Sequence, residues 1–239
     1  RKITEDAGCL FIFDEVITGF RTGPGGAQDY YGVKADLATY GKVIGGGMPV
    51  GLVAGKAEFM DTFDGGQWQY GDDSFPEKPV TFFAGTCVRH PLTIAAVNVM
   101  AKFFLDQPQS YWDEVYAKAA RLAGTIDQFF ADEGIGIRMV QFSSQMFVRV
   151  SDEEKYGGLL FCQLREKGVF ILEGLPCYLT TSHTDEDIDF VINAVKEAVA
   201  EMRQGGFFGG PDGGGDCLGK PLGAQCQTEA ALAKAPVTA

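Results

Sequence analysis

The feature that most constrains the fold is a short apolar run, CLFIFDEVI at residues 9–17, which leads into an Asp-Glu pair. A run of this length, bounded by turn residues, is typical of a strand buried on both faces of a parallel sheet. A second run follows at 35–42 (ADLATYGK) and a third at 45–55, before a short helical pattern at 56–63. Apolar strands that alternate with turns and helices indicate an α/β fold.

The pattern changes along the second half of the chain. Residues 80–86 (VTFFAGT) predict a strand that enters a turn, Pro91 is placed to open a long helix, and another helix is expected at about 110–132. From residue 134 onward the pattern is that of a smaller α+β unit. Its predicted elements are a strand hairpin at 135–150, a helix at about 156–167, strands near 168–172 and 177–181, and a final helix that Thr184 and Asp187 cap.

The chain therefore divides into three predicted parts. Residues 1–133 are the remainder of a large α/β domain, residues 134–203 form a small C-terminal α+β domain, and residues 204–239 form a tail. The tail has eight glycines in its fifteen residues 205–219, a composition typical of linkers, so we expect it to be disordered. The opening residues, RKITEDAG, read as the end of a helix already under way, so we expect a fragment of a longer protein.

Composition excludes several classes of partner. With a net charge of -12, the chain is not expected to bind nucleic acid or an anionic membrane. No apolar run approaches the roughly 20 residues that span a bilayer. Six scattered cysteines without a CxxC pair fit the reduced thiols of a cytoplasmic protein. His90 and His183 have no second ligand at metal-binding spacing, so no metal site is expected.

A strand that ends in acidic residues is one way in which nucleotide hydrolases hold magnesium. Such a site would also need a phosphate-binding loop of the form G-x-x-x-x-G-K-[ST]. The one lysine beside a glycine cluster, Lys42, precedes its glycines, and no Ser or Thr follows it directly. The motif fails on order, so nucleotide hydrolysis is disfavoured unless such a loop lies in sequence upstream of this chain.

A pyridoxal phosphate site needs different groups: a lysine that forms a Schiff base with the aldehyde, and a carboxylate that keeps the pyridinium nitrogen protonated. One predicted strand ends at Asp14 and the next at Lys42, and the carboxyl ends of parallel strands meet at one crevice. A carboxylate and a pyridinium ~4 Å apart attract by about 4 kcal/mol at an effective dielectric constant near 20. The residues alone leave open that Asp14 is a helix cap or surface residue and that Lys42 is a solvated lysine.

Four ordered segments carry a resemblance to a known family. DEVITGFR at 14–21, TYGKVIGGGMPVG at 39–51, FFAGT followed by HP at 82–91, and TTSHTDEDI at 180–188 resemble class III pyridoxal-phosphate aminotransferases of the glutamate-1-semialdehyde aminomutase-like subgroup. The loop WQYGDDSFP at 68–76, together with FFAGTCVRHP at 82–91, resembles the aminotransferase domains in hybrid polyketide synthase–nonribosomal peptide synthetases of the microcystin and nodularin type. The resemblance covers about residues 1–203 and implies fold type I of the pyridoxal-phosphate-dependent transferases.

The resemblance implies a role for each matching residue. Asp14 would pair with the pyridinium nitrogen, Val16 would pack on the ring face, and Lys42 would be the Schiff-base lysine that shuttles the proton. Gly85 and Thr86 would contact the cofactor phosphate from the other subunit of a homodimer. Glu15 and Arg21, which belong to the first motif, are expected to be structural and to hold the loop through charge pairs. The phosphate-binding turn and the ring-stacking aromatic residue of the family are absent from this sequence.

The reaction that the resemblance implies is transfer of an amino group from an amino-acid donor to a β-keto acyl chain on a carrier protein. The alternative is aminomutase or ω-aminotransferase activity on a free small substrate. The loop around Trp68 and Tyr70 would discriminate between them if it lines a channel wide enough for a carrier arm. A non-enzyme alternative is a degenerate aminotransferase fold kept for docking or dimerisation. Because half of the cofactor site is missing, the 239 residues alone are expected to be inactive.

Overall fold

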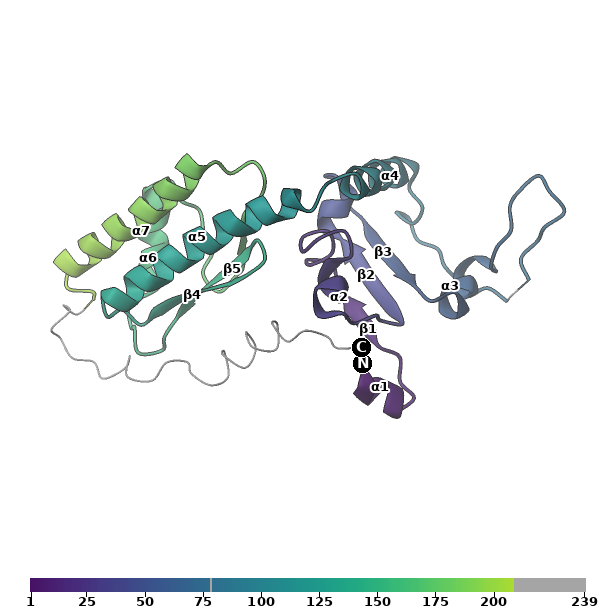
Figure 1. The fold of residues 1–239 in the computed structure, drawn as a ribbon, viewed down its shortest axis with the longest axis horizontal. Coiled ribbons are helices and arrows are strands. Elements are labelled where there is room, and N and C mark those ends of the chain that lie inside the picture. Colours follow the sequence, from purple (N-terminus) through teal and green to yellow (C-terminus); the bar gives the residue numbers. More distant parts are fainter. Residues whose placement is uncertain (78, 209–239) are drawn as a thin grey trace. The chain divides into compact units, whose positions relative to one another are not determined.

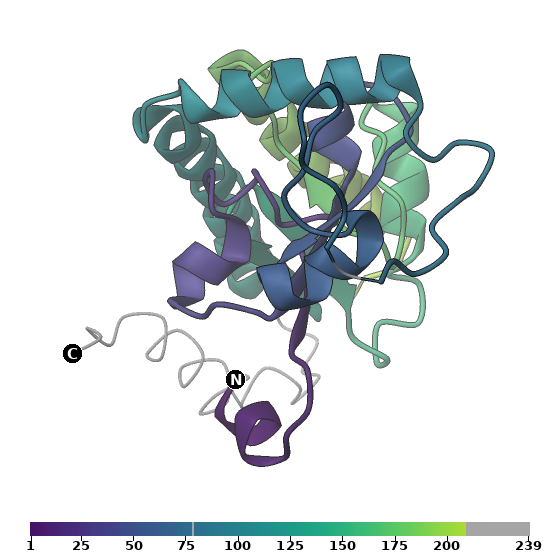
Figure 2. The ribbon, with the colours of Figure 1, turned by 90° about the vertical axis from the view of Figure 1, so that its right-hand side faces the viewer.

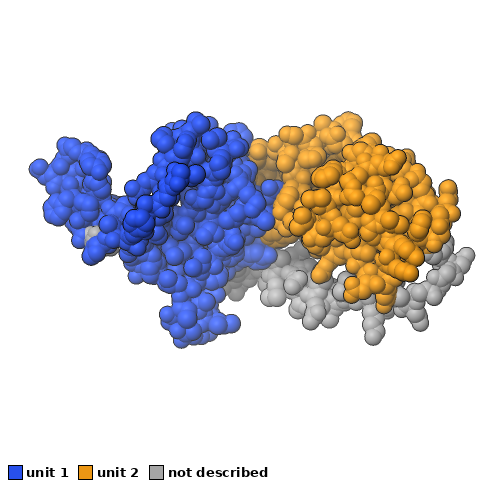
Figure 3. Space-filling model, turned by 180° about the vertical axis from the view of Figure 1, so that it is seen from behind, with its two compact units in different colours: residues 1–109 blue, residues 110–239 orange. Residues whose placement is uncertain are grey.

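The computed structural model describes residues 1–77 and 79–208, and it divides the chain into two compact units (Figure 3). Unit 1 is Arg1–Gln109 and unit 2 is Ser110–Ala239. This division falls before the long helix α5 (Ser110–Asp132), whereas the predicted boundary at residue 134 falls after it. Helix α5 packs against β4 and α7 of unit 2, which accounts for the position of the division.

Unit 1 holds a three-stranded sheet in the order β1-β2-β3 (Figure 1). Strands β1 and β2 are parallel, with Asp14 opposite Thr39, and β3 is antiparallel to β2. The parallel pair confirms the α/β class. The elements are α1 (Lys2–Asp6), β1 (Ile12–Asp14), α2 (Gly26–Tyr31), β2 (Leu37–Gly41), the 3-10 helix η1 (Lys42–Gly45), β3 (Gly51–Gly55), α3 (Ala57–Asp64) and α4 (Pro91–Leu105).

Strand β1 is shorter and more exposed than its sequence indicated. The prediction of a strand over residues 9–17 that is buried on both faces was wrong, because β1 spans only Ile12–Asp14 and Ile12 is 57% exposed. The strand is one edge of its sheet, so it has a hydrogen-bonded neighbour on one side. The main chain turns immediately after Asp14, which places Glu15 and Val16 in the loop that leads to α2.

The strand predicted at residues 80–86 does not form. Between α3 and α4 the chain follows an open path (Figures 1 and 2), and the N–H of Thr81 donates to the carbonyl of Thr62 at 2.7 Å rather than to a strand. Phe82 in this segment is 91% exposed. Pro91 does open α4, as predicted from its fixed φ and missing N–H.

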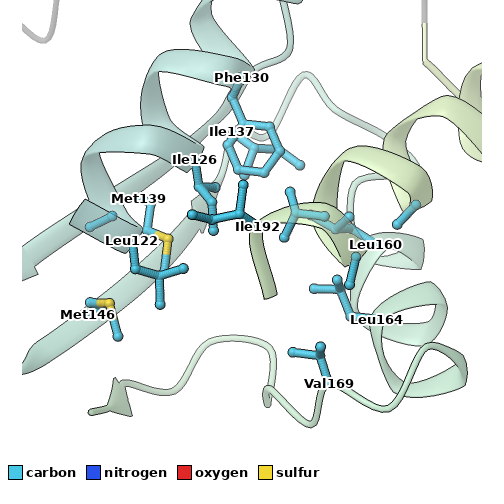
Figure 4. Packing of buried hydrophobic residues seen from close by; sticks show 14 of the residues in the cluster. Leu122, Ile126, Phe130, Ile137, Met139, Met146, Leu160, Leu164, Val169 and Ile192 are labelled. Carbon is cyan, nitrogen blue, oxygen red and sulfur yellow. The ribbon is translucent and has the colours of Figure 1, made fainter. Parts of the chain in front are cut away.

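Unit 2 packs three helices against a small sheet around one hydrophobic core (Figure 4). The hairpin β4 (Ile137–Phe142) and β5 (Gln145–Val150) confirms the predicted strand pair, and β6 (Cys177–Tyr178) adds to β5. The helices are α5, α6 (Leu159–Glu166) and α7 (Asp185–Gln204). The core residues labelled in Figure 4 come from these elements and, for Val169, from the loop after α6: Leu122, Ile126, Phe130, Ile137, Met139, Met146, Leu160, Leu164, Val169 and Ile192.

Two predictions near α6 and α7 had opposite outcomes. Residues 168–172 form no strand, because the N–H of Val169 donates to the carbonyl of Leu164 at 2.8 Å and closes the end of α6. The capping box was right. The N–H of Asp187 donates to the Thr184 hydroxyl at 3.2 Å, and the N–H of Thr184 donates to the Asp187 carboxylate at 2.8 Å.

The predicted linker at 204–239 lies mostly outside the described residues, which end at residue 208. Its first residues belong to unit 2: Gln204 ends α7, and Phe208 is buried in the core. None of the helices that the structure describes is long and apolar enough to cross a lipid bilayer.

Candidate functional site

Asp14 stands at the carboxyl end of β1, where the parallel neighbour β2 also ends. Its carboxylate accepts hydrogen bonds from the Val16 N–H at 2.9 Å and from the Thr39 hydroxyl at 3.3 Å. Within the described part of the chain, both bonds go to Oδ1. One oxygen therefore fixes the direction of this exposed side chain, and Oδ2 makes no hydrogen bond to another described residue.

Lys42 follows the last residue of β2 and opens η1. It lies three residues beyond Thr39, the residue opposite Asp14, or about 10 Å along a strand. Its φ of +52° is in the left-handed region, which is uncommon for a residue with a Cβ and typical of constrained functional positions. The side chain is exposed. The parallel strands thus bring the residues Asp14 and Lys42 to the same end of the sheet.

Val16 lies beside this end of the sheet, against the glycine that precedes the lysine. A Cβ at Gly41 would come within 3.2 Å of the Val50 carbonyl and 3.4 Å of Val16 Cγ1. The absence of a side chain at Gly41 therefore leaves room for Val16 at the strand ends. Gly46 has a similar role on η1: its φ is +56°, and a Cβ there would come within 2.9 Å of Met100 in α4.

Glu15 points into the protein and is fully buried. Its carboxylate accepts hydrogen bonds from the Thr18 hydroxyl, from the Ala27 N–H at 3.0 Å and from the Gln28 N–H at 2.9 Å. The expectation that Glu15 holds the loop through a charge pair was wrong, because these three donors are neutral. The Nε of Arg21 donates to the Ile17 carbonyl at 3.3 Å, a bond within the same loop.

The charge of Glu15 also affects its surroundings. Burial, and then the nearby Glu15 carboxylate, raise the pKa of the Tyr40 hydroxyl, while the hydrogen bond from Gln28 acts in the opposite direction. That bond runs from Gln28 Nε2 to the Tyr40 oxygen at 3.3 Å, and the Ala35 N–H donates to Gln28 Oε1 at 2.9 Å. The loop, α2 and β2 are therefore linked by one polar network, which is buried at Glu15 and partly buried at Gln28 and Tyr40.

Comparison with protein families shows which family this chain belongs to. The model of the aminotransferase class-III family matches residues 1–199. The chain belongs to the class-III aminotransferase family.

Relatives of this class-III aminotransferase chain include aminomutases and transaminases. It is 36% identical over 211 residues to a glutamate-1-semialdehyde 2,1-aminomutase of Methanococcus maripaludis (strain C7 / ATCC BAA-1331), covering 84% of this chain and 47% of that protein. The protein of the same name from Alkaliphilus oremlandii is 36% identical over 214 residues, covering 85% of this chain and 47% of the relative.

Among solved structures, an ω-transaminase from Sphaerobacter thermophilus matches with a TM-score of 0.70 and 27% identity. The match covers 84% of this chain and 46% of that one. This likeness confirms the predicted fold class, fold type I of the pyridoxal-phosphate-dependent transferases, with its mixed α/β architecture. The chain spans about half the length of the relatives it matches.

Gly85 and Thr86 lie in the segment that leads into α4. Both residues are exposed in the segment before α4, where the Val88 N–H donates to the Gly85 carbonyl at 3.1 Å. No hydrogen bond between these residues and the β1–β2 end occurs in the described part of the chain. Their phosphate-binding role stays a prediction.

Thr39 is a residue of the candidate site that was not predicted from the sequence. Its hydroxyl steadies Asp14 and its carbonyl accepts the Glu15 N–H at 2.8 Å. The signal was available in part: Thr39 lies three residues before Lys42 on the strand predicted to pair with β1. Identifying it also required the register, which pairs Asp14 with Thr39.

Proposed function

We propose that this chain is the C-terminal part of a pyridoxal-phosphate-dependent class III aminotransferase that acts on free amino-acid-like substrates. The observation that carries the proposal is the position of Asp14 and Lys42 at one end of the parallel pair β1–β2. Membership of the family supports it independently.

The residues present fit the cofactor. A carboxylate with one oxygen held by Val16 and Thr39 leaves the other for a ring N–H, and the exposed amine of Lys42, which follows the neighbouring strand, suits an aldehyde. Gly41 leaves room for the Val50 carbonyl and for Val16, both of which a Cβ would approach within 3.4 Å. Pyridoxal phosphate, when bound, supplies an electron sink that stabilises negative charge at the carbon next to the amino group.

The chain's own residues would then do three things. Oδ2 of Asp14 would hold the proton on the ring nitrogen, and Val16 would orient the ring by packing on one face. Lys42 Nζ would accept and return the proton that moves between substrate and cofactor carbons, as a general base and acid. Each role depends on the β1–β2 register, because the register sets the separation of Asp14 and Lys42.

We also propose a homodimer in which Gly85 and Thr86 bind the phosphate of the cofactor held mainly by the other subunit. A backbone N–H and a hydroxyl are suitable donors to phosphate oxygens. The exposure of both residues, at a distance in sequence from Asp14 and Lys42, is consistent with this role.

The two enzymatic hypotheses drawn from the sequence differ in the substrate, which is either a free small molecule or an acyl chain on a carrier protein. Relatives named as aminomutases and transaminases favour a free small substrate over a β-keto acyl chain on a carrier protein. The carrier-bound substrate rests on the resemblance of the segments at 68–76 and 82–91, which include His90, and on the glycine-rich composition of the tail.

Half-reaction assays on the full-length protein that contains this chain test the proposal. The protein is mixed with pyridoxal phosphate and then with L-glutamate, L-alanine or a β-amino acid, and the cofactor absorbance is followed. Lys42→Ala is expected to lower the rate by about 10²–10⁴-fold, whereas Lys34→Ala, an exposed lysine on the same unit, leaves it unchanged. Equal rates for wild type and Lys42→Ala would contradict the proposal. Turnover confined to acyl chains on a carrier protein would restore the first hypothesis.

A further inference from the structure

The carboxylate of Glu15 lies next to the proposed cofactor-binding Asp14 in the sequence but has a different environment. Asp14 is exposed at the end of β1, whereas Glu15, the first residue of the loop, is completely buried. Each of its oxygens accepts a backbone N–H: Ala27 to Oε2 at 3.0 Å and Gln28 to Oε1 at 2.9 Å. The Thr18 hydroxyl donates to Oε2 as well.

The main chain of Glu15 is held as firmly as its side chain. Its N–H donates to the Thr39 carbonyl at 2.8 Å, and its carbonyl accepts the Gly19 N–H at 2.9 Å. Thr39 therefore contacts both acidic residues, since its hydroxyl donates to Asp14. The peptide that follows Glu15 carries the Val16 N–H, which holds Asp14 Oδ1.

The surroundings leave the Glu15 carboxylate little freedom to move. A Cβ at Gly26 would lie within 2.8 Å of three of its atoms, and the φ of Gly26 is +66°. A Cβ at Gly19 would come within 2.7 Å of the Glu15 carbonyl and of the Tyr40 ring. Gly26 thus leaves the space in which this carboxylate fits, and Gly19 leaves the space for the Glu15 carbonyl.

We propose that Glu15 is a positioning residue: by binding the loop at Thr18, Ala27 and Gln28, it fixes the main chain that directs the Asp14 carboxylate. The inference rests on the proposed function in one respect, namely that Asp14 binds the cofactor. If the Glu15 side chain is released from Thr18, the turn that carries the Gly19 N–H loosens as well, so the peptide between Glu15 and Val16 can rotate and the Val16 N–H no longer holds Asp14 Oδ1. A buried acidic residue would then control cofactor binding.

The direct test measures amide hydrogen exchange by NMR in the protein without cofactor. In Glu15→Gln, the amide NH₂ cannot accept a hydrogen bond, so one backbone N–H loses its acceptor. Exchange at Val16, Ala27 and Gln28 is expected to accelerate by at least about tenfold, and by less in Thr18→Val, which removes only the hydroxyl donor. Glu58→Gln, an exposed glutamate on α3, is the matched control and leaves all three rates unchanged.

Faster exchange at Ala27 and Gln28 with an unchanged rate at Val16 would overturn the proposal, because Glu15 would then stabilise only the start of α2. If Glu15→Gln fails to fold, the exchange rate at Val16 is compared with the rates at Ala27 and Gln28 in Thr18→Val instead. Because no cofactor is needed, this result is independent of the proposed function.

A second measurement connects Glu15 to the cofactor. The pH midpoint of the pyridoxal phosphate absorbance is compared in wild type, Asp14→Asn, Glu15→Gln and Glu58→Gln. Glu15→Gln is expected to move the midpoint in the same direction as Asp14→Asn, by a smaller amount, whereas Glu58→Gln does not move it. A midpoint unchanged in Glu15→Gln, with Asp14→Asn shifted, would overturn the positioning role while the proposed function stands. An unchanged midpoint in Asp14→Asn would instead contradict the proposed function.

Discussion

At the scale of single residues, three side chains at the β1–β2 end have distinct environments. Asp14 is exposed with one oxygen held, Glu15 is buried among neutral donors, and Lys42 is exposed on a left-handed backbone. The strand-end positions of Asp14 and Lys42 were predictable from the sequence, because each residue ends an apolar run. The hydrogen bonds of Glu15 were not, since they depend on the loop returning to Ala27 and Gln28 twelve and thirteen residues later.

The left-handed backbone at Lys42 predicts a stability difference between two inactive variants. Lys42→Ala keeps the unfavourable φ of +52°, whereas Lys42→Gly removes the Cβ that makes it unfavourable. We expect Lys42→Gly to be more stable than Lys42→Ala by about 1 kcal/mol in the free energy of unfolding, although glycine loses more entropy on folding. Urea denaturation of both variants measures this difference. A more stable Lys42→Ala would show that the position carries no strain.

Asp36 makes unit 1 sensitive to acid. Hydrogen bonds from Arg1 at 2.8 Å, Lys56 and the Phe11 N–H hold the pKa of the Asp36 carboxyl well below its usual range. Because the folded pKa is depressed, the stabilisation is present above the unfolded value of about 3.9 and is lost as the pH falls toward the folded pKa.

Asp36→Asn is therefore expected to lower the Tm at pH 7, with a difference from wild type that is constant above about pH 5 and shrinks below about pH 4. Thermal unfolding by circular dichroism across this pH range measures it. Asp6→Asn is the control, because Asp6 pairs with Lys2 on an exposed helix and such pairs contribute little. A difference that grows in acid would contradict the account of Asp36.

At the scale of elements, the sequence was most informative where neighbouring residues alone determine a helix boundary. Pro91 at the start of α4 and the Thr184–Asp187 capping box each fixed a helix boundary. Residues 80–86 and 168–172 have equally apolar, strand-like patterns, yet neither pairs with a strand. Their N–H groups donate elsewhere, Thr81 to Thr62 and Val169 to Leu164, and such partners are set by tertiary contacts.

The capping box at α7 gives an element-scale prediction. Thr184→Ala removes the acceptor for the Asp187 N–H, so we expect a loss of about 1 kcal/mol in the free energy of unfolding. Ser182→Ala, in the exposed turn just before the helix, is the matched control and is expected to be neutral. Chemical denaturation of the two variants compares them. Equal losses would mean that α7 is held by its packed face alone.

At the scale of the whole molecule, unit 1 leaves much apolar surface exposed. On α4, Leu92, Val99 and Leu105 are more than half exposed, and Phe104 is the one buried residue of the helix. A helix that is apolar on all sides is normally buried. The chain spans about half the length of its relatives, so the missing contacts of α4 and the other part of the cofactor site are expected in the half that this chain does not match.

Because the chain spans about half the length of its relatives, we expect weak cofactor binding by these 239 residues alone. Compared with the same chain preceded by the upstream half of an aminotransferase relative, we expect at least about tenfold weaker binding of pyridoxal phosphate, since phosphate-binding and ring-stacking groups are missing. Equilibrium dialysis of both proteins measures the dissociation constants. Equal constants, or robust turnover by the chain alone, would contradict the prediction.

The central claim is that Lys42 is the residue that bonds to the cofactor aldehyde. The full-length protein that contains this chain is incubated with pyridoxal phosphate, reduced with borohydride, digested and mapped by mass spectrometry. The account predicts a pyridoxyl label on Lys42, and a weaker label in Asp14→Asn. A label on Lys34 or Lys56 with Lys42 unmodified would contradict it.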